Sequence, residues 1–225
     1  MILINGSSNK PLGVFISNKL KIKLSECVLD KFSDGEIQVT LKDNVRNQDV
    51  FIIQSGYSNT DLNYNTNDYL METLILIDAC KRSMAKTINV IMPYYPYSRQ
   101  DKKDESRSPI TAKLVANMLT QSGINRLVVM DLHSSQIQGF FDIPVDNLFA
   151  TPIFARHVKK KIKNKNIICI APDVGGTERA RALGKILNVG LAIVDKRRPK
   201  PGQSQVMNVI GDVKGKTCII VDDII

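Results

Sequence analysis

The stretch Ser108–Met130, which reads SPITAKLVANMLTQSGINRLVVM, decides the fold class. Its first part predicts a helix over Pro109–Thr120, with Ser108 as the N-cap and Pro109 at the first helical position. The apolar run Leu127–Met130 then predicts a short buried strand. A helix followed directly by a buried strand is the repeating unit of α/β proteins with parallel sheets.

The same alternation extends in both directions along the chain. The other predicted strands are Met1–Asn5, Val50–Gln54, Thr87–Met92, Ile167–Ile170, Leu191–Val194 and Cys218–Val221. The other predicted helices are Lys10–Leu20, Asp68–Lys81, Pro152–Ile162 and Thr177–Leu187. Lys31–Leu41 is interpreted as a strand or a hairpin. The sequence therefore predicts an α/β protein whose sheets are mainly parallel.

Three polar segments interrupt this alternation. Asp142–Thr151 separates two strand–helix series, which predicts two similar α/β domains, residues 1–148 and 149–225, with a boundary near Phe149. Tyr57–Asn67 is rich in Asn, Ser and Thr and predicts a polar loop or small insertion. Arg197–Gln205 holds two prolines and a glycine without apolar periodicity, which predicts a mobile loop.

Composition narrows the class of protein but not its function. The chain has 225 residues, 43% hydrophobic and 24% charged, which suits a soluble domain with a core. Its net charge of +9 suits any polyanion, including nucleic acid, an anionic membrane and a phosphorylated metabolite. Aromatic and basic residues are not interleaved, so we expect no nucleic-acid partner. The basic run Lys159–Lys161 is interpreted as the solvated end of a helix.

The N-terminal sequence, the lack of long apolar stretches and the spacing of the cysteines favour a cytoplasmic location for this protein. No window approaches the roughly 18 apolar residues of a membrane span, and the N-terminus lacks the features of a signal peptide. The cysteines are far apart, without a C-x-x-C pair, so neither a disulfide framework nor a zinc site is expected. We therefore expect a cytoplasmic protein without a membrane partner.

Ionisable residues follow four of the predicted strands. The four stretches are Met130-Asp131-Leu132-His133, Ile170-Ala171-Pro172-Asp173, Val194-Asp195-Lys196 and Val221-Asp222-Asp223. A single Asp at such a place is most simply a turn or capping residue. Ligands of parallel sheets, however, bind beyond the carboxyl ends of the strands, so four such ends in one chain favour a shared site.

The turn Asp173-Val174-Gly175-Gly176-Thr177 suits a phosphate and its metal. Paired glycines let the backbone approach a ligand, and the following helix offers free N–H groups to a phosphate. Asp173 could hold Mg²⁺ on that phosphate, because Mg²⁺ needs only one or two protein carboxylates besides substrate oxygens.

Standard nucleotide motifs are absent. Gly215-Lys216-Thr217 resembles the end of a P-loop, but Ile210 stands where the upstream glycine belongs, and a strand follows in place of a helix. His133 is either a ligand or catalytic group or an ordinary polar residue at a strand end. The segment Tyr94–Asp101 is either a surface loop or a site in which aromatic rings stack on a base and Arg99 holds a phosphate.

Several motifs together resemble the ribose-phosphate pyrophosphokinase, or PRPP synthetase, family. They are FSDGE (Phe32–Glu36), NDYLMETL (Asn67–Leu74), PYYPYSRQDKKDESR (Pro93–Arg107), PITAKLVANML (Pro109–Leu119), MDLHSSQIQGFFDIPVDN (Met130–Asn147), APDVGG (Ala171–Gly176), DKRRP (Asp195–Pro199) and VDDII (Val221–Ile225). The match is collinear over the whole chain. It implies two phosphoribosyltransferase-like domains, the second of them incomplete.

The resemblance implies transfer of the β,γ-diphosphoryl group of ATP to ribose 5-phosphate, which gives PRPP and AMP for nucleotide biosynthesis. The implied ATP-binding residues are Phe32, Asp34, Glu36, Arg99, Gln100 and Asp101. The implied Mg²⁺ positions are His133 and Asp173, and the implied catalytic residues are Lys196 and Arg198. Asp222 and Asp223 match the pair that holds the ribose hydroxyls.

The chain departs from the family pattern at two places. The family's acidic strand end continues into a D-T-G-G-T loop that binds the 5-phosphate, whereas this chain ends at Ile225. We therefore expect the 225-residue chain to look like a truncated product that binds ATP weakly and makes little or no PRPP. The polar insertion around Ser58–Asn65 is longer than is usual in the family, without an expected effect on chemistry.

The resemblance also implies a homo-oligomer, a hexamer at full length, with phosphate and ADP as effectors near Lys102–Arg107. Three alternatives stay open. The first is a non-catalytic PRPP-synthetase-associated regulatory subunit, which the intact Lys196 and His133 argue against. The second is a phosphoribosyltransferase, which would not need the DLHSSQIQGFF motif. The third is a nucleic-acid binder, suggested only by the net charge.

Overall fold

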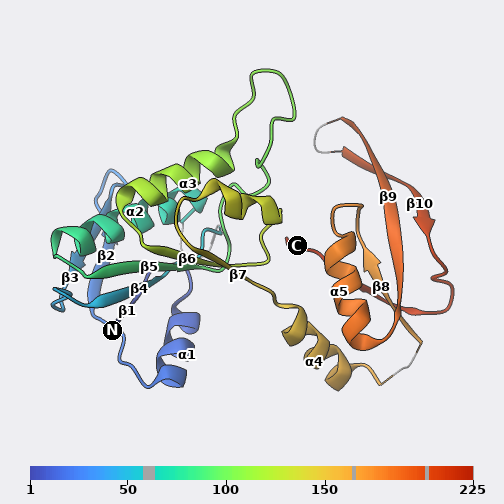
Figure 1. Cartoon of the computed structure of the whole chain (residues 1–225), viewed down its shortest axis with the longest axis horizontal. Coiled ribbons are helices and arrows are strands. Elements are labelled where there is room, and N and C mark those ends of the chain that lie inside the picture. Colours follow the sequence, from blue (N-terminus) through green and yellow to red (C-terminus); the bar gives the residue numbers. More distant parts are fainter. Residues whose placement is uncertain (58–63, 164–165, 201–202, 225) are drawn as a thin grey trace. The chain divides into compact units, whose positions relative to one another are not determined.

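The computed structural model describes residues 1–57, 64–163, 166–200 and 203–224, and for residues 196–200 and 203–207 it describes the backbone alone. The chain divides into two compact units, Met1–Leu148 and Phe149–Ile225 (Figure 1). Each unit is built around its own sheet, and each is described separately below.

The first unit contains a five-stranded sheet in the order β1-β4-β5-β6-β7. The strands are β1 (Ile2–Asn5), β4 (Asp49–Ile53), β5 (Thr87–Met92), β6 (Arg126–Met130) and β7 (Val145–Leu148). Every neighbouring pair is parallel. All five carboxyl ends therefore lie along one edge of the sheet, where ligands of such sheets bind.

Helices lie on both faces of this sheet (Figure 1). On one face are α2 (Thr66–Arg82) and α3 (Thr111–Ser122), and on the other is α1 (Lys10–Leu20). α2 buries a stripe of side chains spaced three and four residues apart, which is the pattern that a helix uses to cover a sheet. The short 3₁₀ helix η2 (Ser135–Phe140) follows β6.

A separate antiparallel hairpin packs along α2. Its strands are β2 (Cys27–Lys31) and β3 (Ile37–Leu41), joined by the pairing of Lys31 with Ile37. One face of each strand is half-buried and the other exposed, so the hairpin covers the helix with one side only.

The second unit has a smaller, four-stranded sheet in the order β10-β9-β8-β11. Its strands are β8 (Ile167–Ala171), β9 (Gly190–Lys200), β10 (Gln203–Ile210) and β11 (Thr217–Ile220). β8 is parallel to both β9 and β11, whereas β10 is antiparallel to β9. The helices α4 (Thr151–Lys161) and α5 (Thr177–Leu187) complete this unit.

The predicted α/β class with mainly parallel sheets is confirmed, and most elements agree with the structure within one or two residues. The segment Lys31–Leu41, interpreted as a strand or a hairpin, covers the turn and β3, whereas β2 lies before it apart from Lys31. β7 was missed because it lies inside the polar segment interpreted as a break between domains, and β10 was also missed.

The predicted loop at Arg197–Gln205 is wrong over its described backbone. β9 continues to Lys200 and β10 begins at Gln203, so the segment forms an antiparallel pair. β8 pairs with β9 only as far as Ile193, and the outer part of β9 is therefore paired on one side alone. A strand paired on one side tolerates proline, which is why Pro199 does not end it.

Within the described residues, no helix is long and apolar enough to cross a membrane.

Candidate active site

A buried carboxylate, that of Glu72 on α2, joins the ends of β1 and β4. Glu72 accepts hydrogen bonds from the backbone N–H of Ser7 at 2.8 Å, from its hydroxyl at 2.6 Å and from Gln54 Nε2 at 2.6 Å. Gln54 Oε1 accepts from the Ser8 amide, and Ser8 Oγ accepts from the Ser55 amide. Glu72 and Gln54 are both fully buried. These bonds compensate the cost of burying the carboxylate and fix both strand ends.

The loop after β5, which carries the predicted nucleotide residues, is held by backbone and aromatic contacts. The Tyr94 amide donates to Ser55 Oγ at 3.2 Å. The buried Tyr95 donates its hydroxyl to Ala112 O at 2.9 Å and packs edge-on against Phe141. Burial raises the pKa of the Tyr95 phenol far above its usual range, so this group stays a hydrogen-bond donor.

Arg99 and Gln100 lie on the exposed side of this loop, and Asp101 is half-buried. The backbone carbonyl of Gln100 accepts from the amide of Ala112 at 3.1 Å, and its side chain accepts from the hydroxyl of Thr111. Gln100 therefore caps the start of α3.

The predicted capping role of Ser108 is wrong. α3 begins at Thr111, and no side chain caps it. The hydroxyl of Ser108 instead donates to the carbonyl of Glu105 at 2.7 Å and accepts from the Glu105 amide at 3.3 Å, so it bonds within the preceding turn.

The tip of the β2–β3 hairpin carries Phe32, Asp34 and Glu36, and all three are exposed. The tip is closed by hydrogen bonds from the Phe32 amide to Glu36 O and from the Gly35 amide to Phe32 O. Gly35 has φ of 93°, a conformation that favours glycine. The turn thus presents three side chains to solvent on a short, closed loop.

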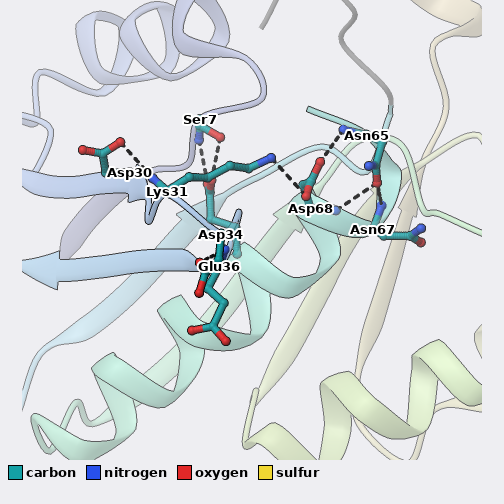
Figure 2. Close-up of polar contacts among 9 residues, drawn as sticks. Ser7, Asp30, Lys31, Asp34, Glu36, Asn65, Asn67 and Asp68 are labelled. Carbon is teal, nitrogen blue, oxygen red and sulfur yellow. Dashed lines mark hydrogen bonds and ion pairs between the residues drawn. The ribbon is translucent and has the colours of Figure 1, made fainter. Parts of the chain in front are cut away.

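The first turn of α2 contacts both the hairpin tip and the loop after β5. Lys31, at the base of the hairpin tip, forms an ion pair with Asp68 at 3.1 Å, and Figure 2 shows this pair beside Asp34 and Glu36. On the same turn, Asn67 accepts a hydrogen bond from the Tyr97 hydroxyl in the loop after β5. The two predicted parts of the nucleotide site in this unit are therefore attached to one helical turn.

His133 lies at the carboxyl end of β6 and is exposed. The preceding residue, Leu132, is buried and donates its amide to Asn147 Oδ1 at 3.2 Å. Asp131 has a positive φ of 46° and donates its amide to Leu148 O at 2.8 Å. This turn directs the chain out of the sheet, so that His133 reaches the surface at the edge where the strands end.

In the second unit, the turn after β8 is shaped around Asp173. Asp173 Oδ1 accepts from the amide of Gly176 at 3.0 Å, which orients the carboxylate. A Cβ at the buried Gly176 would lie 3.2 Å from Pro172 Cδ, so the turn has no room for a larger residue without adjustment. The structure therefore contains the close backbone turn that the paired glycines predict.

The acidic pair at the end of β11 is paired with Arg179 on α5. Arg179 Nη1 lies 3.1 Å from Asp223 Oδ1 and 3.9 Å from Asp222 Oδ1. Burial raises the pKa of Asp222, and the adjacent Asp223 and the nearby Asp173 raise it further. Since β8 and β11 are neighbours, Asp173 and the acidic pair lie at the same edge of this sheet.

Asp195 does not end a strand as predicted, because β9 continues beyond it and pairs it with Asn208 of β10. Lys196 and Arg198 follow on the same strand, and their side chains lie outside the described residues. Residues 58–63 of the predicted insertion also lie outside them.

The predicted residues are therefore distributed over two separately described units. The hairpin tip, the loop after β5 and His133 belong to the first, and Asp173, Asp222 and Asp223 belong to the second. Within the described part of the chain, no three His, Cys, Asp or Glu side chains converge as a metal cluster. A metal at His133 or Asp173 would accordingly take most of its ligands from substrate and water.

Sequence reasoning missed Glu72, Lys31, Asp68 and Arg179. One of them gave a signal: Glu72 falls on the stripe of α2 that also buries Tyr69 and Leu76, and a charged residue at such a position indicates a buried polar contact. The pairs formed by the other three depend on tertiary contacts between segments far apart in sequence.

Comparisons with known proteins match both parts of the chain. The family described as the N-terminal domain of ribose phosphate pyrophosphokinase matches residues 1–123, and a phosphoribosyl transferase domain matches residues 145–225. The ribose-phosphate pyrophosphokinase of Agrobacterium fabrum is 53% identical over 225 residues, which are 100% of this chain and 71% of the relative. That of Staphylococcus epidermidis is 48% identical over 227 residues and is covered to 69%.

A solved structure gives the same result. The crystal structure of phosphoribosylpyrophosphate synthetase from Mycobacterium smegmatis superimposes with a TM-score of 0.88 at 38% identity, covering 98% of this chain and 70% of that one. These relatives carry the name of the enzyme, and nothing in them supports the alternative of a regulatory subunit. The chain belongs to the ribose-phosphate pyrophosphokinase family.

Proposed function

We propose that this chain transfers the diphosphoryl group of ATP to ribose 5-phosphate, giving PRPP and AMP. The observation that carries the proposal is the 53% identity to a ribose-phosphate pyrophosphokinase over the full 225 residues. The motif residues, from the FSDGE hairpin to the V-D-D strand end, are all present in the chain.

In the first unit, the proposed ATP-binding residues are Phe32, Asp34, Glu36, Arg99, Gln100 and Asp101. The exposed tip of the hairpin supplies an aromatic ring and two carboxylates, which suit an adenine ring and ribose hydroxyls. Arg99 suits a phosphate, because its guanidinium can donate two parallel hydrogen bonds to it. All of these side chains except the half-buried Asp101 are exposed, which supports their availability to a ligand.

Mg²⁺ is the proposed metal, with His133 and Asp173 as its protein positions. The orientation of Asp173 by the Gly176 amide supports this assignment, since a single fixed carboxylate with phosphate oxygens is a set of ligands that Mg²⁺ accepts. When bound, the ion would neutralise charge on the phosphate oxygens. Imidazole is a less usual ligand for this ion, so the role of His133 rests on the family motif.

Lys196 and Arg198 are the proposed catalytic residues. Phosphoryl transfer requires little of a protein beyond positioning and cations placed against the charge of the transferred and leaving oxygens. Their place on the outer part of β9, beyond its pairing with β8, supports a segment that contacts substrate from outside the sheet. Exclusion of water at this point would favour the sugar hydroxyl as acceptor.

Asp222 and Asp223 are proposed to hold the ribose hydroxyls of ribose 5-phosphate. Carboxylates accept hydrogen bonds from sugar hydroxyls, and the raised pKa of Asp222 is an indication of a confined acidic pair. The contact with Arg179 supports a fixed geometry for Asp223.

We further propose a cytoplasmic homo-oligomer, hexameric at the length of its relatives, with phosphate and ADP as effectors. The free thiols of all four cysteines suit a reducing compartment. The exposed, charged segment of residues 102–107 suits an anionic effector. Sedimentation velocity with and without phosphate would test both the assembly and its response.

The activity is tested by measuring AMP and PRPP formed from ATP, ribose 5-phosphate and Mg²⁺. We expect the AMP that is released, in however small an amount, to require ribose 5-phosphate, and Lys196→Ala to lower this turnover by orders of magnitude with little change in ATP affinity. Formation of AMP without ribose 5-phosphate, or without matching PRPP, would contradict the proposed reaction. Equal turnover of Lys196→Ala and the unchanged chain would remove Lys196 from catalysis.

A further inference from the structure

The first turn of α2 is an anchor shared by two segments that are distant in sequence. One is the tip of the β2–β3 hairpin, and the other is the loop after β5, which begins more than fifty residues later. Both contacts are made by side chains, because neither belongs to the backbone hydrogen bonding of a sheet or a helix.

The contact to the hairpin is the ion pair of Lys31 with Asp68. Lys31 Nζ lies 3.1 Å from Asp68 Oδ1 and 3.9 Å from the centre of the Tyr64 ring. The side chains of Lys31 and Asp68 are only 25% and 19% exposed, so solvent screens this pair less than a surface pair. Lys31 is also the last paired residue of β2, which makes it the base of the turn that presents Phe32.

Asp68 is held in place by the cap of its own helix. Its second oxygen, Oδ2, accepts from the Asn65 amide at 2.7 Å, while Asn65 Oδ1 accepts from the amides of Asn67 and Asp68. This reciprocal capping box fixes the carboxylate, so that Lys31 meets an acceptor that is already oriented.

The contact of α2 with the loop after β5 is made by Asn67, the residue before Asp68 on the same helical turn. Asn67 Oδ1 accepts from the Tyr97 hydroxyl. Tyr97 has a positive φ of 59°, and its carbonyl accepts from the Gln100 amide at 3.0 Å. The side chain of Tyr97 thus fixes the turn that sets the position of Arg99.

We propose that Lys31, Asp68 and Asn67 are positioning residues that hold the adenosine-contacting hairpin and the phosphate-contacting loop on one rigid turn of α2. The inference rests on the proposed ATP site, but its structural part stands without any ligand. Removing one contact should loosen one segment and leave the other in place, whereas disturbing Asp68 should loosen both.

The first test is amide hydrogen exchange of the unliganded 225-residue chain, read at single residues by NMR. Lys31→Met should raise the exchange of Phe32, Gly35 and Glu36 and leave the Gln100 amide unchanged. Tyr97→Phe should raise the exchange of the Gln100 amide and leave the exchange of Phe32, Gly35 and Glu36 unchanged. Asp68→Asn should affect both segments, because it weakens the ion pair and the cap together.

Asp78→Asn is the matched control. Asp78 lies on the same helix and pairs with Arg82 at 2.6 Å, but the side chains of Arg82 and Asp78 are 79% and 54% exposed. We expect no change at either segment. Unchanged exchange at the hairpin in Lys31→Met, or an equal effect of Asp78→Asn, would overturn the proposal.

The second test compares binding of MgATP with binding of magnesium tripolyphosphate, by calorimetric titration. Lys31→Met should weaken MgATP binding about tenfold and leave tripolyphosphate binding unchanged, since the hairpin is assigned to the adenosine. An equal loss for both ligands would overturn the assignment of the hairpin anchor. If the unchanged chain binds MgATP no more tightly than tripolyphosphate, the proposed nucleotide site fails, and the exchange pattern still decides the anchor.

Discussion

At the scale of single residues, Glu72 shows how a buried charge can be kept in a sheet protein. Three donors, two from Ser7 and one from Gln54, surround its carboxylate, and each finds an acceptor there. The two N–H donors share Oε1 and the Ser7 hydroxyl donates to Oε2, so the negative charge of the carboxylate strengthens every bond of the group.

Glu72→Gln should therefore destabilise the first unit although the side chain keeps its shape. The amide oxygen would still accept from Ser7 N and Gln54 Nε2, and Ser7 Oγ would accept from the amide N–H, but these bonds would lose the strength that the carboxylate charge gives them, at a cost of about 1–3 kcal/mol. Urea denaturation measures this difference. As a control, Glu26→Gln removes an exposed carboxylate paired with Lys23 and should change stability by less than about 1 kcal/mol.

Asp222 predicts a dependence of stability on pH. Burial and the adjacent Asp223 raise its pKa, so the folded chain keeps this proton to a higher pH than the unfolded chain. Asp222 therefore lowers stability as the pH rises from about 4 through the raised value.

Asp222→Asn should remove that effect, because the amide resembles the protonated acid. Relative to the unchanged chain, the variant should gain melting temperature between pH 4 and pH 7. A difference between the two chains that stays constant over this range would contradict the raised pKa.

At the scale of elements, the starts of α2 and α3 are stabilised differently. Asn65 caps α2 through its side chain, whereas the Gln100 carbonyl serves α3. Asn65→Ala should accordingly cost about 1 kcal/mol in the free energy of unfolding.

Ser108→Ala, by contrast, should have little effect on α3, since Ser108 bonds only within the turn before it. Chemical denaturation of both variants checks the pair. A similar loss in both would show that Ser108 supports the helix in some other way.

The elements that the sequence predicted well are those whose burial is local and complete. Thr87–Met92 is mainly apolar because a central parallel strand is covered on both faces, and its bounds agree with β5. β7 has the sequence VDNL, and its pairing with β6 depends on a partner already in place. The outer part of β9 contains a proline and basic residues, and only its pairing with β10 makes it a strand.

The candidate site likewise contains features that the sequence predicted and features that it did not. The strand pattern placed Arg99 after the strand at Thr87–Met92 and Asp173 after the strand at Ile167–Ile170, and the structure has both residues in the segments that follow β5 and β8. The sequence did not reveal the contacts that hold the segments of the site, such as Lys31 with Asp68, because contacts between distant segments leave no local pattern.

At the scale of the whole molecule, the chain passes from one unit to the other between Leu148 and Phe149, both of which are exposed. Exposed aromatic and aliphatic residues at a boundary are good substrates for a protease. Limited digestion with chymotrypsin should therefore cut first near this point. We expect the released first unit to keep a cooperative thermal transition, and its loss would show that the five-stranded sheet needs the second unit.

The order of strands in the first unit also has a consequence for folding. After β1 pairs with β4, each later strand joins the same growing edge in the order of synthesis, β5, then β6, then β7. The first pairing must close a loop of more than forty residues, Ile2 to Val50, which makes it the slow step. Thereafter a nascent chain leaving the ribosome exposes one apolar edge at a time, and each edge stays open to other chains only until the next strand arrives.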